Sequence, residues 1–128
     1  MPGTPDAPVL LDANAVLRYL LDDIDDQASQ VEAAIRSGAE VTPEVIAECV
    51  YVLGGVYGVS RSMIAESLGM LLDEVFCARG AVAASALGLY GAGSFDFVDC
   101  VLAAEHMVSG RKVLTFDKKL RKLLATCE

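Results

Sequence analysis

Short apolar runs alternate with helix-like segments along this 128-residue chain, and this alternation constrains its fold most strongly. The run Pro8–Leu11 ends at Asp12, and the β-rich run Lys112–Phe116 ends at Asp117. Two shorter runs of strand-like composition lie between them, Glu40–Val41 and Glu74–Cys77. Strands separated by helices predict a parallel sheet that is covered by helices. We therefore expect an α/β fold of three layers, with a short, mostly parallel sheet flanked by helices.

Helical periodicity fills the intervals between these runs. Thr42-Pro43 is the clearest helix start, because a capping residue is followed by proline in the first turn. Ser60 is a second predicted cap. The predicted helices span residues 14–21, 27–36, 43–56, 61–73, 81–90, 96–109 and 118–124. The length predicts a single domain over residues 1–128, and residues 1–7, rich in proline, predict a flexible leader without a signal-peptide pattern.

Charge and composition restrict the function. A net charge of −8 argues against a broad surface for binding polyanions. Six of the ten basic residues lie between Arg111 and Lys122, so we expect any nucleic-acid contact to be local to that segment. The four cysteines form no Cys-x-x-Cys pair and predict buried thiols in a reducing, cytoplasmic setting. No apolar run reaches the ~18 residues of a membrane span.

Five acidic residues occupy positions where carboxylates are usually functional. Asp96 and Asp99 lie three apart at a helix start, where they share a face and are favoured by the helix dipole. Asp12 and Asp117 follow predicted strands, at the edge where α/β sheets form their sites. Glu48 lies in an otherwise apolar helix, so we expect it to be buried and to point into a polar site. We expect these acids to meet in one site.

Several carboxylates in one pocket repel one another, and a divalent cation removes that repulsion. Oxygen ligands suit Mg²⁺ or Mn²⁺, and the chain's single histidine argues against zinc. Such an ion can activate a water molecule and stabilise charge on a phosphoryl oxygen, so phosphodiester hydrolysis is the predicted reaction. We expect the polar side chains of Asn14, Ser94 and Thr115 to orient the ligands or the water.

Each of these acids also has a simpler interpretation. Asp12 and Asp117 can cap the helices that follow them, and Glu48 can be solvated. Asp96 can cap its helix while Asp99 bonds back to it, as in a capping box. Four basic residues near the end of the chain are either a solvated face or a contact to RNA phosphates. These residues are Lys118, Lys119, Arg121 and Lys122.

Four motifs, taken in order, resemble the PIN-domain ribonucleases, and more narrowly the VapC toxins of bacterial toxin–antitoxin pairs. The motifs are Leu-Asp-Ala-Asn-Ala-Val at 11–16, Ala-Glu-Cys-Val-Tyr-Val-Leu at 47–53, Asp-Phe-Val-Asp at 96–99 and Leu-Thr-Phe-Asp at 114–117. The resemblance covers residues 9–124. It implies an RNA endonuclease dependent on Mg²⁺ or Mn²⁺, often a homodimer, that is held inactive by a cognate antitoxin.

The resemblance also assigns roles to single residues. It implies that Asp12, Glu48, Asp99 and Asp117 are the catalytic, metal-binding acids, and that Asp96 is an additional acid which some members carry. Asn14 and Thr115 match supporting polar positions of the same family.

Two rival functions stay open. A haloacid-dehalogenase-like phosphatase also has an aspartate after its first strand, but it requires Asp-x-Asp, and Asn14 takes the second place here. A PIN-like fold can also be a catalytically silent binding module. Cleavage of RNA that requires Mn²⁺ and is stopped by a chelator separates both from the nuclease, whereas hydrolysis of small phosphomonoesters favours the phosphatase.

Overall fold

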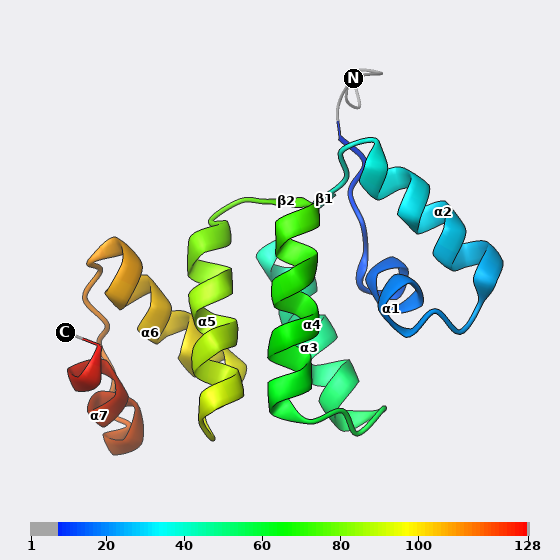
Figure 1. Ribbon diagram of the computed structural model, residues 1–128. Helices are drawn as coiled ribbons and strands as arrows, with labels where there is room; N and C mark the ends of the chain where they lie inside the picture. Colours follow the sequence, from blue (N-terminus) through cyan, green and yellow to red (C-terminus); the bar gives the residue numbers. More distant parts are fainter. Residues whose placement is uncertain (1–7, 128) are drawn as a thin grey trace.

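The computed structural model describes residues 8–127, so the predicted leader, residues 1–7, lies outside the described residues (Figure 1). The fold is α/β, as predicted, but helices dominate it. The strands are β1 (Glu40–Val41) and β2 (Phe76–Cys77). The helices are α1 (Ala13–Leu21), α2 (Asp25–Arg36), α3 (Pro43–Gly55), α4 (Arg61–Glu74), α5 (Gly80–Ala92), α6 (Phe97–Ser109) and α7 (Lys118–Thr126).

The sheet is parallel and very short. Glu40 of β1 pairs with Phe76 of β2, and Val41 pairs with Cys77. The predicted strand at residues 8–11 is reduced to an isolated parallel bridge between Leu10 and Glu40. In that bridge the Leu11 amide donates to the Glu40 carbonyl at 2.9 Å, and the Glu40 amide donates to the Val9 carbonyl at 2.8 Å. Asp12 still follows this bridge directly, at the carboxyl end of the paired segment, where α/β folds form their sites.

The predicted strand at residues 112–116 is wrong, because residues 111–117 have no regular secondary structure. Leu114 is 87% exposed and Phe116 is 81% exposed. Gly110, with φ of 68°, ends α6 and turns the chain, and the segment then runs to α7 at the end of the molecule away from α1 and α2 (Figure 1). A high β-propensity makes a strand only where an edge is in reach to pair with.

The helix starts follow the predicted capping residues. Thr42 Oγ1 accepts from the Val45 amide at 3.3 Å, and Ser60 Oγ accepts from the Met63 amide at 3.3 Å. Helix α2 begins at Asp25, two residues before the predicted start, with Ile24 as a cap that makes no side-chain bond. Two aspartates in its first turn compensate, because negative charge is favourable at a helix N-terminus.

The core lies between the central helices. Phe97 of α6 is buried and meets the ring of Tyr90 of α5 edge to face, with 5.9 Å between the ring centroids. Burial of each such side chain contributes roughly 1.5–3 kcal/mol. Other fully buried side chains come from α1, α3, α4 and α5: Val16, Ile46, Val50, Ile64, Leu68, Leu71 and Leu87. Within residues 8–127, no helix has the length and apolar character needed to cross a membrane.

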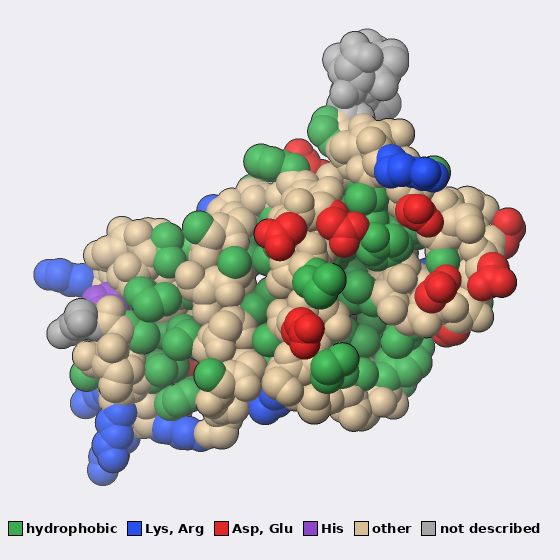
Figure 2. Space-filling model, viewed as in Figure 1, with side chains coloured by type: hydrophobic (Ala, Val, Ile, Leu, Met, Phe, Trp, Pro, Cys, Tyr) green, Lys and Arg blue, Asp and Glu red, His purple; other side chains and the backbone are tan. Residues whose placement is uncertain are grey.

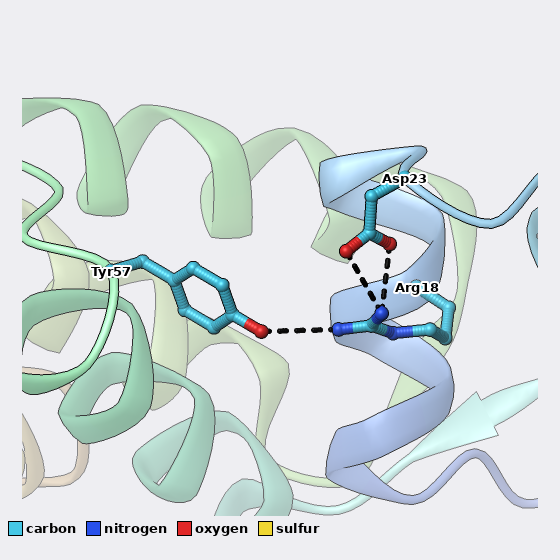
Figure 3. A network of polar contacts seen from close by, with 3 residues as sticks. All are labelled: Arg18, Asp23 and Tyr57. Atoms are coloured by element: carbon cyan, nitrogen blue, oxygen red, sulfur yellow. Dashed lines mark hydrogen bonds and ion pairs between the residues drawn. The ribbon is translucent and has the colours of Figure 1, made fainter.

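At the end of the molecule away from α7, a polar contact joins α1 to the turn after α3 (Figure 3). The Arg18 guanidinium binds both carboxylate oxygens of Asp23, at 2.8 and 2.9 Å, and donates to the Tyr57 hydroxyl at 3.2 Å. Asp22, before Asp23, has a left-handed backbone with φ of 49° and ends α1. This contact involves none of the five predicted site acids.

Candidate active site

Asp12 is the N-cap of α1 and is exposed. Its carboxylate accepts from the Ala15 amide at 2.8 Å, so the capping interpretation is confirmed for this residue. Asn14, in the first turn of α1, is also exposed. A cap bond uses one carboxylate oxygen as an acceptor and leaves the other free, so capping and metal binding are compatible at this position.

Glu48 is exposed, and the prediction that it is buried is wrong. Helix α3 buries one face, which carries Ile46, Cys49, Val50 and Leu53, and presents the other to solvent. Glu48 lies on the solvent face with Tyr51, one turn later. The apolar residues around Glu48 in the sequence wrongly indicated burial. A 13-residue helix can be rich in apolar side chains and still expose one face to solvent.

The carboxylates of Asp12 and Glu48 act on the same thiol, that of Cys49. Burial, together with the negative charges of Glu48 and Asp12, raises the pKa of Cys49 to about 12. The Cys49 Sγ donates a long hydrogen bond, 3.9 Å, to the Ala13 carbonyl. These contacts place the start of α1 against the middle of α3, which brings the first two predicted acids to one side of the molecule.

Asp96 is the N-cap residue of α6, but its side chain makes no cap bond. The predicted capping-box bond is therefore absent. Both carboxylate oxygens of Asp96 instead accept from the Tyr51 hydroxyl, at 3.2 and 3.3 Å. This bond places Tyr51 beside the predicted acids.

Asp99 lies in the first turn of α6 and is partly buried. Desolvation is the main cause that raises its pKa, followed by the negative charges of Asp96 and Asp117, while the Lys119 ammonium lowers it. Like charges are thus held near one another around Asp99. Such an arrangement costs free energy in the folded protein, and active sites commonly contain it.

Asp117 caps α7 and accepts from the Leu120 amide at 3.0 Å. Thr115 supports it, because the Thr115 Oγ1 accepts from the Asp117 amide at 3.1 Å. The Thr115 carbonyl in turn accepts from the Arg121 Nε at 2.9 Å. The supporting role predicted for Thr115 therefore has a structural counterpart, although it acts through the backbone of Asp117.

Two cations fix the loop that leads into Asp96. The Arg61 guanidinium lies 3.7 Å from the centre of the Tyr90 ring and donates to the carbonyls of Tyr90, at 2.9 Å, and Phe95. On the other side, the Lys119 Nζ donates to the Ser94 Oγ at 3.3 Å and lies 4.8 Å from the centre of the Phe95 ring. Sequence reasoning missed Arg61, whose only signal was a cation following a helix cap.

The four basic residues of α7 divide into two pairs. Lys119 and Arg121 make the internal contacts just described, whereas Lys118 and Lys122 are exposed and bond to no other residue among those described. Figure 2 shows most of the lysine and arginine side chains in view at the end of the molecule that carries α7, whereas the acidic side chains in view lie over the rest. Lys118 and Lys122 are therefore the cations available to a ligand.

An ion pair between a buried glutamate and an exposed arginine was also not predicted from the sequence. Glu105 of α6 is 9% exposed, and its carboxylate pairs with Arg79, which has a left-handed backbone before α5. Glu105 lies on a different side of α6 from Asp99, since residues six apart in an α-helix are rotated by about 120° from each other. The ion pair joins α5 to α6 and stands outside the predicted site.

The five predicted acids thus form two groups. The charges of Asp12 and Glu48 act on Cys49, and those of Asp96 and Asp117 act on Asp99. Tyr51, one turn after Glu48 in α3, bonds to Asp96 and so connects the two groups. Over residues 8–127, no three His, Cys, Asp or Glu side chains lie close enough together to hold one metal ion. The donor chemistry fits a hard divalent cation, because the ligands offered are all carboxylates.

The chain matches the family model described as "PIN domain" over residues 9–124. No curated protein and no solved structure matches the chain. PIN domains are typically metal-dependent nucleases. The family match covers all five acids, the Tyr51–Asp96 contact and α7. Since it includes nearly the whole sequence, the chain belongs to the PIN domain family.

Proposed function

We propose that this protein is an endoribonuclease dependent on Mg²⁺ or Mn²⁺ and that it is the toxin of a type II toxin–antitoxin pair of the VapC kind. The observation that carries the catalytic part is the environment of Asp99. Its carboxylate is desolvated and lies near those of Asp96 and Asp117, at the N-termini of α6 and α7. A divalent cation is the usual way to relieve such repulsion.

The roles of the residues follow from their places. Asp99 and Asp117 would hold the ion, with Asp12 and Glu48 as the remaining carboxylates. The bound ion would supply an activated water molecule and charge stabilisation at the phosphoryl oxygen. Thr115 supports Asp117, and the Ser94 hydroxyl accepts from Lys119. Asn14 would be the supporting polar residue next to Asp12.

Lys118 and Lys122 would contact the phosphates of the RNA substrate. Both are exposed and close in sequence to Asp117, and each bonds to none of the described residues. Each phosphate contact should contribute about one unit to the slope of affinity against salt concentration. Lys118→Gln and Lys122→Gln should therefore weaken RNA binding and reduce its salt dependence, while folding stays unchanged.

The proposed protein partners are a second copy and a cognate antitoxin. Large apolar side chains are exposed on the central helices, among them Val56, Met63 and Met70, at 74%, 51% and 59%. Figure 2 shows hydrophobic side chains exposed over these helices. Exposed apolar area of this kind commonly marks a protein interface. Sedimentation velocity with and without the product of the neighbouring gene tests both partners.

The catalytic proposal is tested with purified protein and a mixed RNA pool. Cleavage with Mn²⁺ that stops with a chelator is the expected result, and Asp99→Asn should abolish it in a protein that is still folded. Absence of cleavage by a well-folded protein would overturn the proposed nuclease activity and favour a binding module. Hydrolysis of small phosphomonoesters without RNA cleavage would favour the phosphatase.

The toxin proposal needs its own test. Induced expression should arrest growth, the Asp99→Asn protein should not, and co-expression of a small neighbouring gene should restore growth. RNA cleavage in the test tube without any growth arrest would support the nuclease activity and contradict the role as a toxin.

A further inference from the structure

The Tyr51–Asp96 contact joins two elements that carry different site acids. Tyr51 lies on the solvent face of α3, one turn after Glu48, and its hydroxyl lies 3.2 and 3.3 Å from the carboxylate oxygens of Asp96. Asp96 begins α6, whose first turn carries Asp99. Among the described residues, the Tyr51 hydroxyl connects α3 with the start of α6 through hydrogen bonds to the Asp96 carboxylate and to the Val98 backbone.

Apolar packing among α3, α5 and α6 is incomplete at one place. A small apolar cavity of about 20 Å³ lies between α3, α5 and α6, lined by Ile46, Val82, Ala83, Phe97 and other residues. Apolar contact alone sets an orientation less sharply where it is incomplete, because the side chains around a void lose contacts on one side. The directional bond between Tyr51 and Asp96 therefore adds to the apolar contacts that orient the start of α6 relative to α3.

The bond also determines what Asp96 is free to do. Asp96 occupies the N-cap position without making the cap bond, and both of its oxygens face the Tyr51 hydroxyl. A carboxylate with an ordinary cap role would turn to the amides of α6. Tyr51 therefore holds Asp96 away from the helix and gives its charge a fixed place beside Asp99.

We infer that Tyr51 is a positioning residue of the acidic site: through its hydroxyl bond to Asp96 it sets the start of α6, and with it Asp99, relative to Glu48 on α3. This inference rests on the proposed function for the identity of the ligand, a divalent cation. Tyr51 touches neither the ion nor the RNA in this role. Its removal should weaken ion binding and leave the chemical step intact once the ion is bound.

The test compares Tyr51→Phe with a matched control, Tyr57→Phe. The two tyrosines are 46% and 45% exposed, and each hydroxyl makes a hydrogen bond, but Tyr57 bonds to Arg18, which lies outside the site. Mn²⁺ binding is measured on the full chain by titration, with free Mn²⁺ followed by electron paramagnetic resonance. Tyr51→Phe should raise the Mn²⁺ Kd about tenfold, the lower end expected for loss of a supporting hydrogen bond around a metal, and Tyr57→Phe should leave it unchanged.

Asp96→Ala tests the same bond from its other end, and it serves if Tyr51→Phe proves poorly folded. Because Tyr51 acts through Asp96, the double variant should bind Mn²⁺ no more weakly, within about twofold, than the weaker-binding single variant. RNA cleavage by Tyr51→Phe should return to the wild-type rate at saturating Mn²⁺, since only ion binding is affected.

Three results would overturn the inference. They are equal Mn²⁺ affinity in Tyr51→Phe and Tyr57→Phe, losses that multiply in the double variant, and absence of Mn²⁺ binding by the wild-type chain. Mn²⁺ binding that depends on Tyr51 without any RNA cleavage would instead support the inference while removing the nuclease, so the two failures are distinguishable.

Discussion

Gly91 of α5 lies against Ala65 of α4 so closely that a Cβ atom on Gly91 would be 2.7 Å from the Ala65 Cβ. Real Cβ atoms do not approach to that distance, so the two helices must separate if Gly91 gains a side chain. We predict that Gly91→Ala lowers the free energy of unfolding by about 1–2 kcal/mol, because overpacking outweighs the gain in helix propensity. Urea unfolding measures the change.

Gly88 is the matched control for that substitution, in the same helix. It is exposed, and a Cβ atom there would meet nothing within 4 Å. Gly88→Ala should raise the free energy of unfolding by up to about 1 kcal/mol, the full propensity difference. A loss of stability at Gly88 equal to that at Gly91 would contradict the close approach of α4 and α5.

Removing the charge of Asp99 should stabilise the folded protein. Its carboxylate is desolvated and repelled by Asp96 and Asp117, so its pKa is raised. We predict that Asp99→Asn raises the free energy of unfolding at pH 7 by about 0.5–1 kcal/mol in metal-free buffer, while it abolishes activity. Urea unfolding with a chelator present measures the first effect, and a destabilised variant would argue against repulsion at this position.

The same repulsion has a defined pH dependence. With its pKa raised in the folded state, Asp99 binds more protons in the folded protein than in the unfolded chain, so its ionisation lowers stability as pH rises through the folded pKa. The advantage of Asp99→Asn should therefore be present at neutral pH and shrink as the pH falls through that value. Parallel urea titrations of wild type and variant between pH 4 and pH 7 measure the difference, which should not grow on acidification.

Asp96 should tolerate a conservative change that Asp99 does not. Asparagine at Asp96 keeps an oxygen that accepts from the Tyr51 hydroxyl, whereas asparagine at Asp99 removes a charge proposed to hold the ion. RNA cleavage by Asp99→Asn should fall at least about 100-fold, and that by Asp96→Asn by much less. Equal losses in the two variants would give the two aspartates equal roles.

Arg61 should be needed for stability through the loop before α6. Its guanidinium stacks on Tyr90 and donates to the Tyr90 and Phe95 carbonyls. We predict that Arg61→Ala lowers the free energy of unfolding by about 2–3 kcal/mol, since two carbonyl partners and a stacked cation are lost together. Arg36→Ala, an exposed position near the end of α2, should change it by less than about 0.5 kcal/mol.

The helices were predictable from the sequence because their signals are local. Thr42-Pro43 and Ser60 mark starts through bonds within one turn, and the observed helices begin where these residues predict. The start of α2 was missed by two residues because its cap, Ile24, makes no side-chain bond that a sequence pattern reveals.

The predicted strands depended on pairing that no local pattern contains. Residues 112–116 have strand-like composition, yet they lie exposed because α6 packs along α5 and carries them away from β1 (Figure 1). The acids were identified by position, but the exposure of Glu48 depends on which face of α3 is buried. The bond between Tyr51 and Asp96 joins residues 45 apart in the sequence, and only the packing of α3 with α6 brings them together.

The burial of Cys49, near the charges of Asp12 and Glu48, has a chemical consequence. Only the thiolate reacts with alkylating agents and oxidants, and a pKa of about 12 leaves almost none of it at neutral pH. The thiol is also fully buried between α1 and α3. Its modification therefore requires α1 to separate from α3, so the rate at which Cys49 is labelled measures how often that half of the acidic site opens.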